Sequence, residues 1–147
     1  MSLLAAVRPD DWNFPLFLHV LSAMALFGAV VLAVVSVSGN SQAGLRLGFR
    51  TLLIGAIPAW IAMRVSAQWI ASKEGLLDED VEVPAWVDLG FMTSEGSFLF
   101  LIAATVCSGI ATRRGRGGGL RTATIVCVGI TILAYLVAIW AMSTKPT

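Results

Sequence analysis

The chain has 147 residues, of which 57% are hydrophobic and 13% are charged, and its formal net charge is +1. Ordinary soluble domains contain about 45–50% apolar and about 25% charged residues. This composition argues against a soluble enzyme, a nucleic-acid-binding protein and a disordered chain. The mean hydropathy of +0.84 is typical of an integral membrane protein.

Four stretches of the sequence are long and apolar enough to cross a bilayer, which takes about 20 mostly apolar residues in a helix. They cover, approximately, residues 14–37, 47–71, 91–112 and 122–142. Because these stretches use most of the chain, we expect a single all-α domain over residues 1–147. The expected architecture is an integral membrane bundle of four transmembrane helices, each antiparallel to its neighbours in the chain.

The loops between these stretches are sorted by charge. The first and third loops contain arginine and no acidic residue: Arg46, Arg50, Arg113, Arg114, Arg116 and Arg121. The second loop region combines Lys73 with Glu74, Asp78, Glu79, Asp80, Glu82 and Asp88. Because cytoplasmic loops collect Lys and Arg, we expect both termini to be extracytoplasmic, on the side of the acidic loop. Trp12, Trp69, Trp86 and Trp140 fall at the same boundary, as an aromatic belt would.

Each stretch also carries one polar residue about 6–10 Å from that outer boundary, at a rise of 1.5 Å per residue. These residues are His19, Arg64, Glu95 and Tyr135, and Trp60 shares the helix face of Arg64. Ionisable residues within a span are costly and mark functional sites. We therefore expect an outer-leaflet pocket lined by these five residues, with a kink at proline 58 in the second helix opening the space.

Several roles fit these five residues. In a structural role, Arg64 and Glu95 neutralise each other, or Arg64 reaches the lipid headgroups. In a cofactor site, His19 is the metal ligand for the iron of haem b, and Arg64 binds a propionate. Trp60 and Tyr135 would then pack on the flat ring. The same donors suit a quinone or a lipid headgroup, and a proton path through Glu95 and His19 is the least favoured role.

The first helix carries a motif, His19-Val20-Leu21-Ser22-Ala23 followed by Gly28. It resembles the pattern His-hydrophobic-hydrophobic-x-Ala-x4-Gly of several small bacterial four-helix membrane families. One is the copper-resistance D-type membrane domain, and another is the HemJ-type protoporphyrinogen oxidase, which binds haem. Pro58, Trp60 and Lys145-Pro146 are also similar to HemJ-type residues. The resemblance implies a bacterial plasma membrane protein in which His19 is a haem or metal ligand, and a HemJ-like haem-biosynthesis oxidase as one alternative.

Residues 86–114 are similar to uncharacterised actinobacterial integral membrane proteins, which imply no particular function. A different class of function is an accessory or structural subunit that packs against a larger membrane complex or a second copy of the chain. Small residues at four-residue spacing let helices approach closely, as at Ala103, Cys107 and Ala111. No pairing of a nucleophile with a base is apparent, so the sequence favours a protein that is not an enzyme. We expect a small multi-pass protein, surrounded by lipid, whose pocket binds haem b or a quinone in a redox role.

Overall fold

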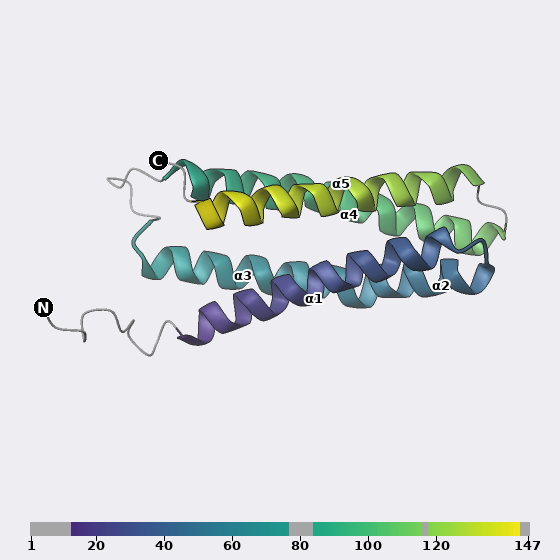
Figure 1. Ribbon diagram of the computed structural model, residues 1–147. Helices are drawn as coiled ribbons and strands as arrows, with labels where there is room; N and C mark the ends of the chain where they lie inside the picture. The colour runs from purple at the N-terminus through teal and green to yellow at the C-terminus, as the bar shows by residue number, and fades with distance from the viewer. Residues whose placement is uncertain (1–12, 77–83, 116–117, 145–147) are drawn as a thin grey trace, which may run out of the picture.

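The computed structural model describes residues 13–76, 84–115 and 118–144. They form α1 (Asn13–Ser38), α2 (Gln42–Arg50), the π-helical segment η3 (Thr51–Ala56), α3 (Ile57–Lys73), α4 (Ala85–Arg114) and α5 (Gly118–Thr144). Because α2, η3 and α3 follow one another without a break, the described residues make four helical rods, each long and apolar enough to cross a membrane (Figure 1). The predicted all-α bundle of four helices is confirmed, and each rod extends beyond its predicted bounds at both ends.

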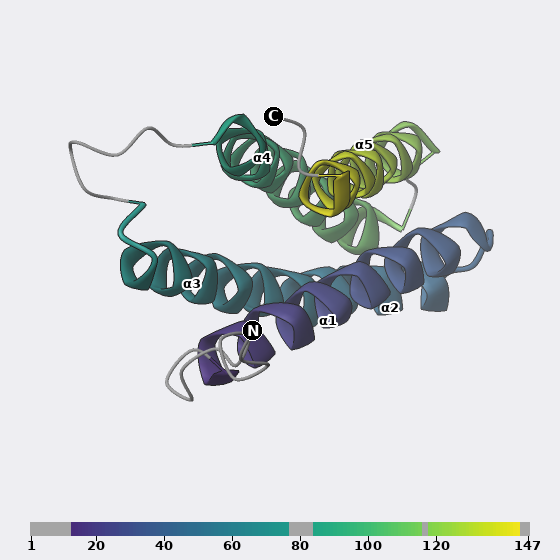
Figure 2. The same cartoon turned by 60° about the vertical axis from the view of Figure 1, so that its left-hand side comes forward.

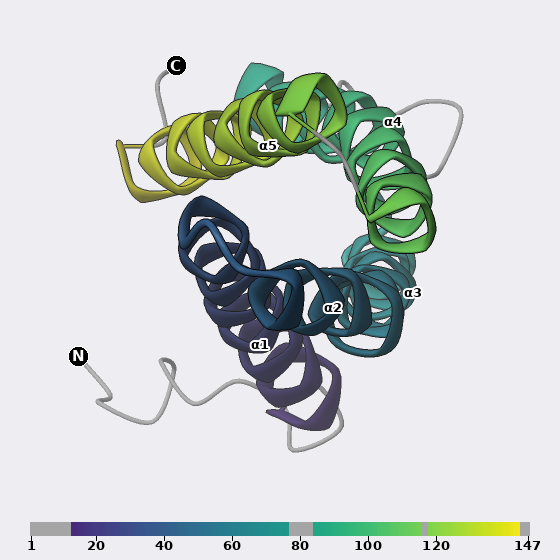
Figure 3. The same cartoon turned by 90° about the vertical axis from the view of Figure 1, so that its right-hand side faces the viewer.

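The rods are arranged as two hairpins. The rod α2–η3–α3 packs along α1, and α4 packs along α5 (Figures 1 and 2). The end of the bundle that holds Glu74 and Asp88 is called the acidic end below. The opposite end holds Arg46, Arg50, Arg113 and Arg114 and is called the basic end. Figure 3 looks along the bundle from the basic end and shows one hairpin facing the other.

At the basic end α1 turns tightly into α2. Ser41 is the N-cap of α2, and its hydroxyl accepts a hydrogen bond from the backbone N–H of Gly44 at 3.0 Å, which satisfies one of the free amides of the first turn. A Cβ at Gly44 would lie 2.2 Å from the backbone oxygen of Ser36, and one at Gly48 would lie 2.4 Å from the Val37 side chain. The two glycines therefore permit the close approach of α2 to α1.

Arg121 joins the two hairpins at the basic end. Its guanidinium group donates to the backbone carbonyls of Val37, at 2.6 Å, and Gly39, at 2.7 Å, and to the side-chain oxygen of Asn40. The last carbonyls of a helix have no partner within the helix, so Arg121 caps the end of α1 from α5. The Gln42 amide adds a second link, a 2.8 Å hydrogen bond to the carbonyl of residue 112 on α4.

The second rod contains a wider helical turn just before Pro58. Proline has no backbone N–H, so it cannot bond the carbonyl four residues earlier, and its ring crowds that turn. In η3 the backbone N–H of Ile57 bonds the carbonyl of Leu52, five residues earlier. Such π-helical adjustments accommodate proline in membrane helices. The expected disturbance at Pro58 is thus a π-helical segment, and the rod continues through it.

The two hairpins are packed together by an apolar core and diverge toward the acidic end. The largest fully buried side chains of this core are Leu26, Val30, Leu52, Leu101 and Val128. Toward the acidic end the backbones of α3 and α4 separate (Figure 2), and these two helices meet through long side chains. Large apolar side chains such as Phe17, Ile54 and Leu99 cover the outside of the rods, where they suit contact with lipid.

Three of the four tryptophans expected in the aromatic belt belong to the acidic end. Trp69 lies near the end of α3, Trp86 in the first turn of α4 and Trp140 in the last turns of α5. The Trp69 ring meets the edge of Phe14 from α1, with ring centroids 6.3 Å apart. Trp12, Arg116 and the acidic residues at positions 78–82 lie outside the described residues.

Candidate functional site

A cavity opens between the diverging hairpins in the acidic half of the bundle. Its volume is about 310 Å³. All four rods contribute to the wall, which is mainly apolar and includes Leu16, Phe27, Met63, Phe91, Ala138 and Ile139. Apolar walls with a few polar groups are typical of sites for small molecules. The polar groups of this wall are His19, Arg64, Glu74, Ser94 and Tyr135.

His19 is oriented by the second rod. Its Nδ1 atom lies 3.1 Å from the backbone carbonyl of Met63 and 3.5 Å from the Ser66 hydroxyl. Because a carbonyl oxygen only accepts, Nδ1 must carry the proton in this hydrogen bond, and in the neutral ring Nε2 then has a free lone pair. His19 lines the cavity, so its Nε2 atom is the acceptor that this side chain offers to a ligand.

Two hydroxyl groups on the cavity wall have no partner with normal hydrogen-bond geometry among the described residues. The Ser94 and Tyr135 side-chain oxygens are buried and unpaired among the described residues, and both residues are more than nine-tenths buried. In contrast, the neighbouring hydroxyls of Thr93 and Ser97 on α4 donate to carbonyls of their own helix. A buried hydroxyl without a partner costs about 1–3 kcal/mol. A ligand with polar atoms in the cavity would remove that cost.

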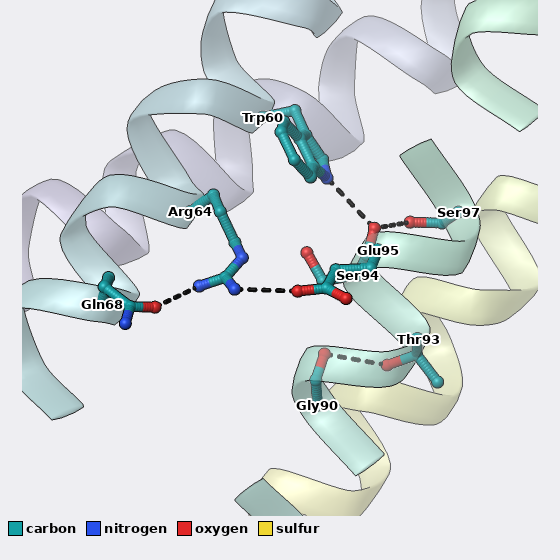
Figure 4. Close-up of polar contacts among 8 residues, drawn as sticks. All are labelled: Trp60, Arg64, Gln68, Gly90, Thr93, Ser94, Glu95 and Ser97. Atoms are coloured by element: carbon teal, nitrogen blue, oxygen red, sulfur yellow. Dashed lines mark hydrogen bonds and ion pairs between the residues drawn. The ribbon is translucent and has the colours of Figure 1, made fainter. Parts of the chain in front are cut away.

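Arg64 and Glu95 form an ion pair across the gap between α3 and α4. The Arg64 Nη2 and Glu95 Oε1 atoms are 2.9 Å apart, and the other Nη donates to the Gln68 side chain at 2.7 Å (Figure 4). The guanidinium carbon also lies 4.5 Å from the centre of the Phe91 ring. Arg64 lines the cavity, whereas Glu95 is outside its wall and 62% exposed. The mutual neutralisation expected from the sequence is therefore present.

Both the indole N–H and the ring of Trp60 are engaged by other residues of the protein. Its indole N–H donates to the Ser94 carbonyl at 3.2 Å (Figure 4). The indole ring also stacks on Phe98, with centroids 3.9 Å apart and planes inclined by 18°. Trp60 therefore links α3 to α4 beside the cavity and is not part of its wall.

The structure thus brings three of the five predicted site residues, His19, Arg64 and Tyr135, to one cavity, and it places Trp60 and Glu95 at the adjoining α3–α4 contact. Sequence reasoning missed Ser94, although a serine within an apolar span was a visible signal. The described residues contain no group of three or more His, Cys, Asp or Glu side chains that could hold a metal ion. A metal at this site would therefore have His19 as its main protein ligand.

Comparison of this chain with protein-family models, with curated proteins and with solved structures finds no match. The chemistry of the cavity follows from its own groups: one imidazole acceptor, two hydroxyls that both donate and accept, the Glu74 carboxylate, and an arginine whose charge is balanced by Glu95. This set suits a neutral, mainly apolar ligand with two or more oxygen atoms.

Proposed function

We propose that this protein binds a quinone in the cavity between its two hairpins. The observation that supports this proposal is the pair of buried, unpartnered hydroxyls of Ser94 and Tyr135 on the wall that also holds His19. A quinone is a flat apolar ring with two carbonyl oxygens, which accept hydrogen bonds from hydroxyls. Its reduced form carries hydroxyl groups that would donate to Nε2 of His19.

The charge balance and the shape of the site favour a neutral ligand of this kind. Arg64 is paired with Glu95 and Gln68, so an anionic ligand would have to compete with an ion pair that is already made. The apolar wall and the separation of the hairpins suit a ring that enters from the bilayer with its hydrocarbon tail still in lipid.

The test is the binding of a short-tailed quinone to the protein purified in detergent, measured by calorimetry. Tyr135→Phe and Ser94→Ala each remove one hydroxyl, and we expect each to weaken binding by about 5–10-fold, the value of one hydrogen bond of roughly 1 kcal/mol. Thr93→Val is the matched control, because the Thr93 hydroxyl bonds its own helix. Equal affinities for all four proteins would contradict the proposal.

Haem b is the second candidate, and the orientation of His19 favours it. Histidines that bind metals usually donate their other ring N–H to a carbonyl or a carboxylate, as His19 does to Met63. One feature fits less well, because Arg64 would have to leave Glu95 to bind a propionate. His19 would bind the iron, and haem would supply one-electron chemistry.

An absorption spectrum separates the two candidates. The protein is expressed with haem supplied in the medium and purified in detergent. A Soret band that is lost in His19→Ala would support haem b and replace the quinone proposal. A colourless, folded protein that binds the quinone would exclude haem b.

We also propose that the acidic end faces outward from a bacterial plasma membrane. The support is the charge of the two ends: the turns at the basic end carry arginine and no acid, as cytoplasmic loops do. After replacement of Cys107 and Cys127 by alanine, Ser72→Cys and Gly119→Cys place one thiol at each end. In intact cells a membrane-impermeant maleimide should label Ser72→Cys only. Labelling of Gly119→Cys alone would reverse the orientation.

A further inference from the structure

Among the described residues, the arginines of the basic end have no acidic partner. Every acidic residue of the sequence lies at positions 10–11 or 74–95, and none lies in the turns at this end. Arg121 is engaged with the end of α1, but Arg46, Arg50, Arg113 and Arg114 are exposed, and no ion pair involves them in the described part of the chain. The described residues supply no counter-charge to these four arginines.

One of these arginines closes a groove between the two hairpins. The groove lies between α2 and α4, has a volume of about 230 Å³ and is lined by Phe49, Thr105, Val106, Gly109, Ile110 and Arg113. Val106, Ile110 and Arg113 follow one another at spacings of four and three, so they share one face of α4. The groove is therefore apolar along its length and cationic where α4 ends.

Gly109 gives the groove its depth. A Cβ at this position would lie 3.0 Å from the Phe49 ring, so the ring of α2 rests on the bare backbone of α4. A larger side chain at position 109 would fill the space and leave every charge in place.

We propose that this groove binds an anionic phospholipid, with the phosphate at Arg113 and an acyl chain along Val106 and Ile110. Three observations support it: the missing counter-charge, the apolar groove that ends in an arginine, and its position at the end of a membrane-spanning helix. Basic pockets between transmembrane helices are suited to anionic headgroups. The proposal is independent of the ligand in the cavity near His19.

The test is lipid binding to the full-length protein in detergent, measured by native mass spectrometry with phosphatidylglycerol and phosphatidylcholine of identical chains. The wild type should retain one phosphatidylglycerol molecule and should clearly prefer it to phosphatidylcholine. Arg113→Gln should lower its association constant by about fivefold, which is the effect of one basic residue at an anionic surface. Gly109→Leu should weaken binding of the lipid by blocking the groove, although the charge is unchanged.

Arg114→Gln is the matched control, because Arg114 has the same charge at the same end but does not line the groove. Its preference for phosphatidylglycerol should stay within twofold of the wild type. Equal losses in Arg113→Gln and Arg114→Gln would overturn the proposal in favour of diffuse attraction to a charged surface. Dimers that disappear in Gly109→Leu would show a second copy of the chain in the groove, and would overturn it too. A thermal melt of each variant confirms that the fold is retained.

Discussion

At the scale of single residues, the ion pair between Arg64 and Glu95 is the interaction whose disruption we expect to affect stability most. Both side chains lie within membrane-spanning rods, and a charge there is tolerated when its partner lies close to it. Removal of one partner leaves the other charge facing an apolar environment. Removal of both partners leaves no unpaired charge, although the hydrogen bond between Arg64 and Gln68 is also lost.

We therefore expect Arg64→Met and Glu95→Gln each to lower the free energy of unfolding by about 1–3 kcal/mol, while the double variant loses less than the worse single variant. Unfolding in detergent, followed by circular dichroism, measures all four proteins of the cycle. Strictly additive losses would show that the two groups do not act as a pair.

The residues of the site differ in how far the sequence could predict them. His19, Arg64 and Glu95 could be found because polar groups in an apolar span stand out, and their depths matched. Ser94 could not be ranked above the other hydroxyls of α4, because most such hydroxyls bond their own helix and only packing shows which one does not. The capping role of Arg121 was hidden for a similar reason. An arginine in a turn indicates how the neighbouring helices are oriented in the membrane, but it does not show which groups the arginine itself binds.

At the scale of elements, the contact between α1 and α2 depends on a lack of side chains. A Cβ at Gly44 would meet a backbone oxygen, which cannot move aside as a flexible side chain can. The sequence predicted a helix start near residue 47, but the structure begins the helix at Gln42, because Ser41 supplies the N-cap. Helix starts before an apolar run are set by such local hydrogen bonds, which hydropathy does not detect.

We expect Gly44→Ala to lower the free energy of unfolding by about 1–3 kcal/mol, since overpacking forces the backbone to shift. Gly28→Ala is the control, because nothing lies within 4 Å of a Cβ at that position in α1. It should be neutral or stabilise by up to roughly 1 kcal/mol, the difference in helix propensity between the two residues. Equal effects of the two substitutions in a denaturant melt would refute the close approach.

At the scale of the whole molecule, four spans and their alternating direction followed from hydropathy. The divergence of the hairpins did not, because it depends on which helix faces pack together over long sequence separations. Each hairpin is held mainly by contacts between its own two rods. Between the hairpins, α4 packs closely on α2 at the basic end, whereas α3 and α4 meet mainly through side chains such as Arg64 and Glu95. The cavity is a result of that uneven distribution.

Residues 1–76 and 77–147, expressed as separate chains in the same cells, are therefore expected to assemble and to copurify in mild detergent. Arg121→Gln in the second chain should reduce recovery of the first by several-fold, because it removes the bonds to the carbonyls of Val37 and Gly39. Arg114→Gln is the matched control. If the fragments never copurify, the hairpins are not separable units.

The bond between Arg121 and the Val37 carbonyl also bears on how the chain is made. The first hairpin ends at Lys73, 48 positions before Arg121, and ribosomes add about 5–20 residues per second, so the completed hairpin waits roughly 2–10 s for this hydrogen bond. During that interval the carbonyls at the end of α1 are open to water, chaperones and membrane proteases. The abundance of the protein in cells should therefore depend on how quickly residues 74–121 are translated.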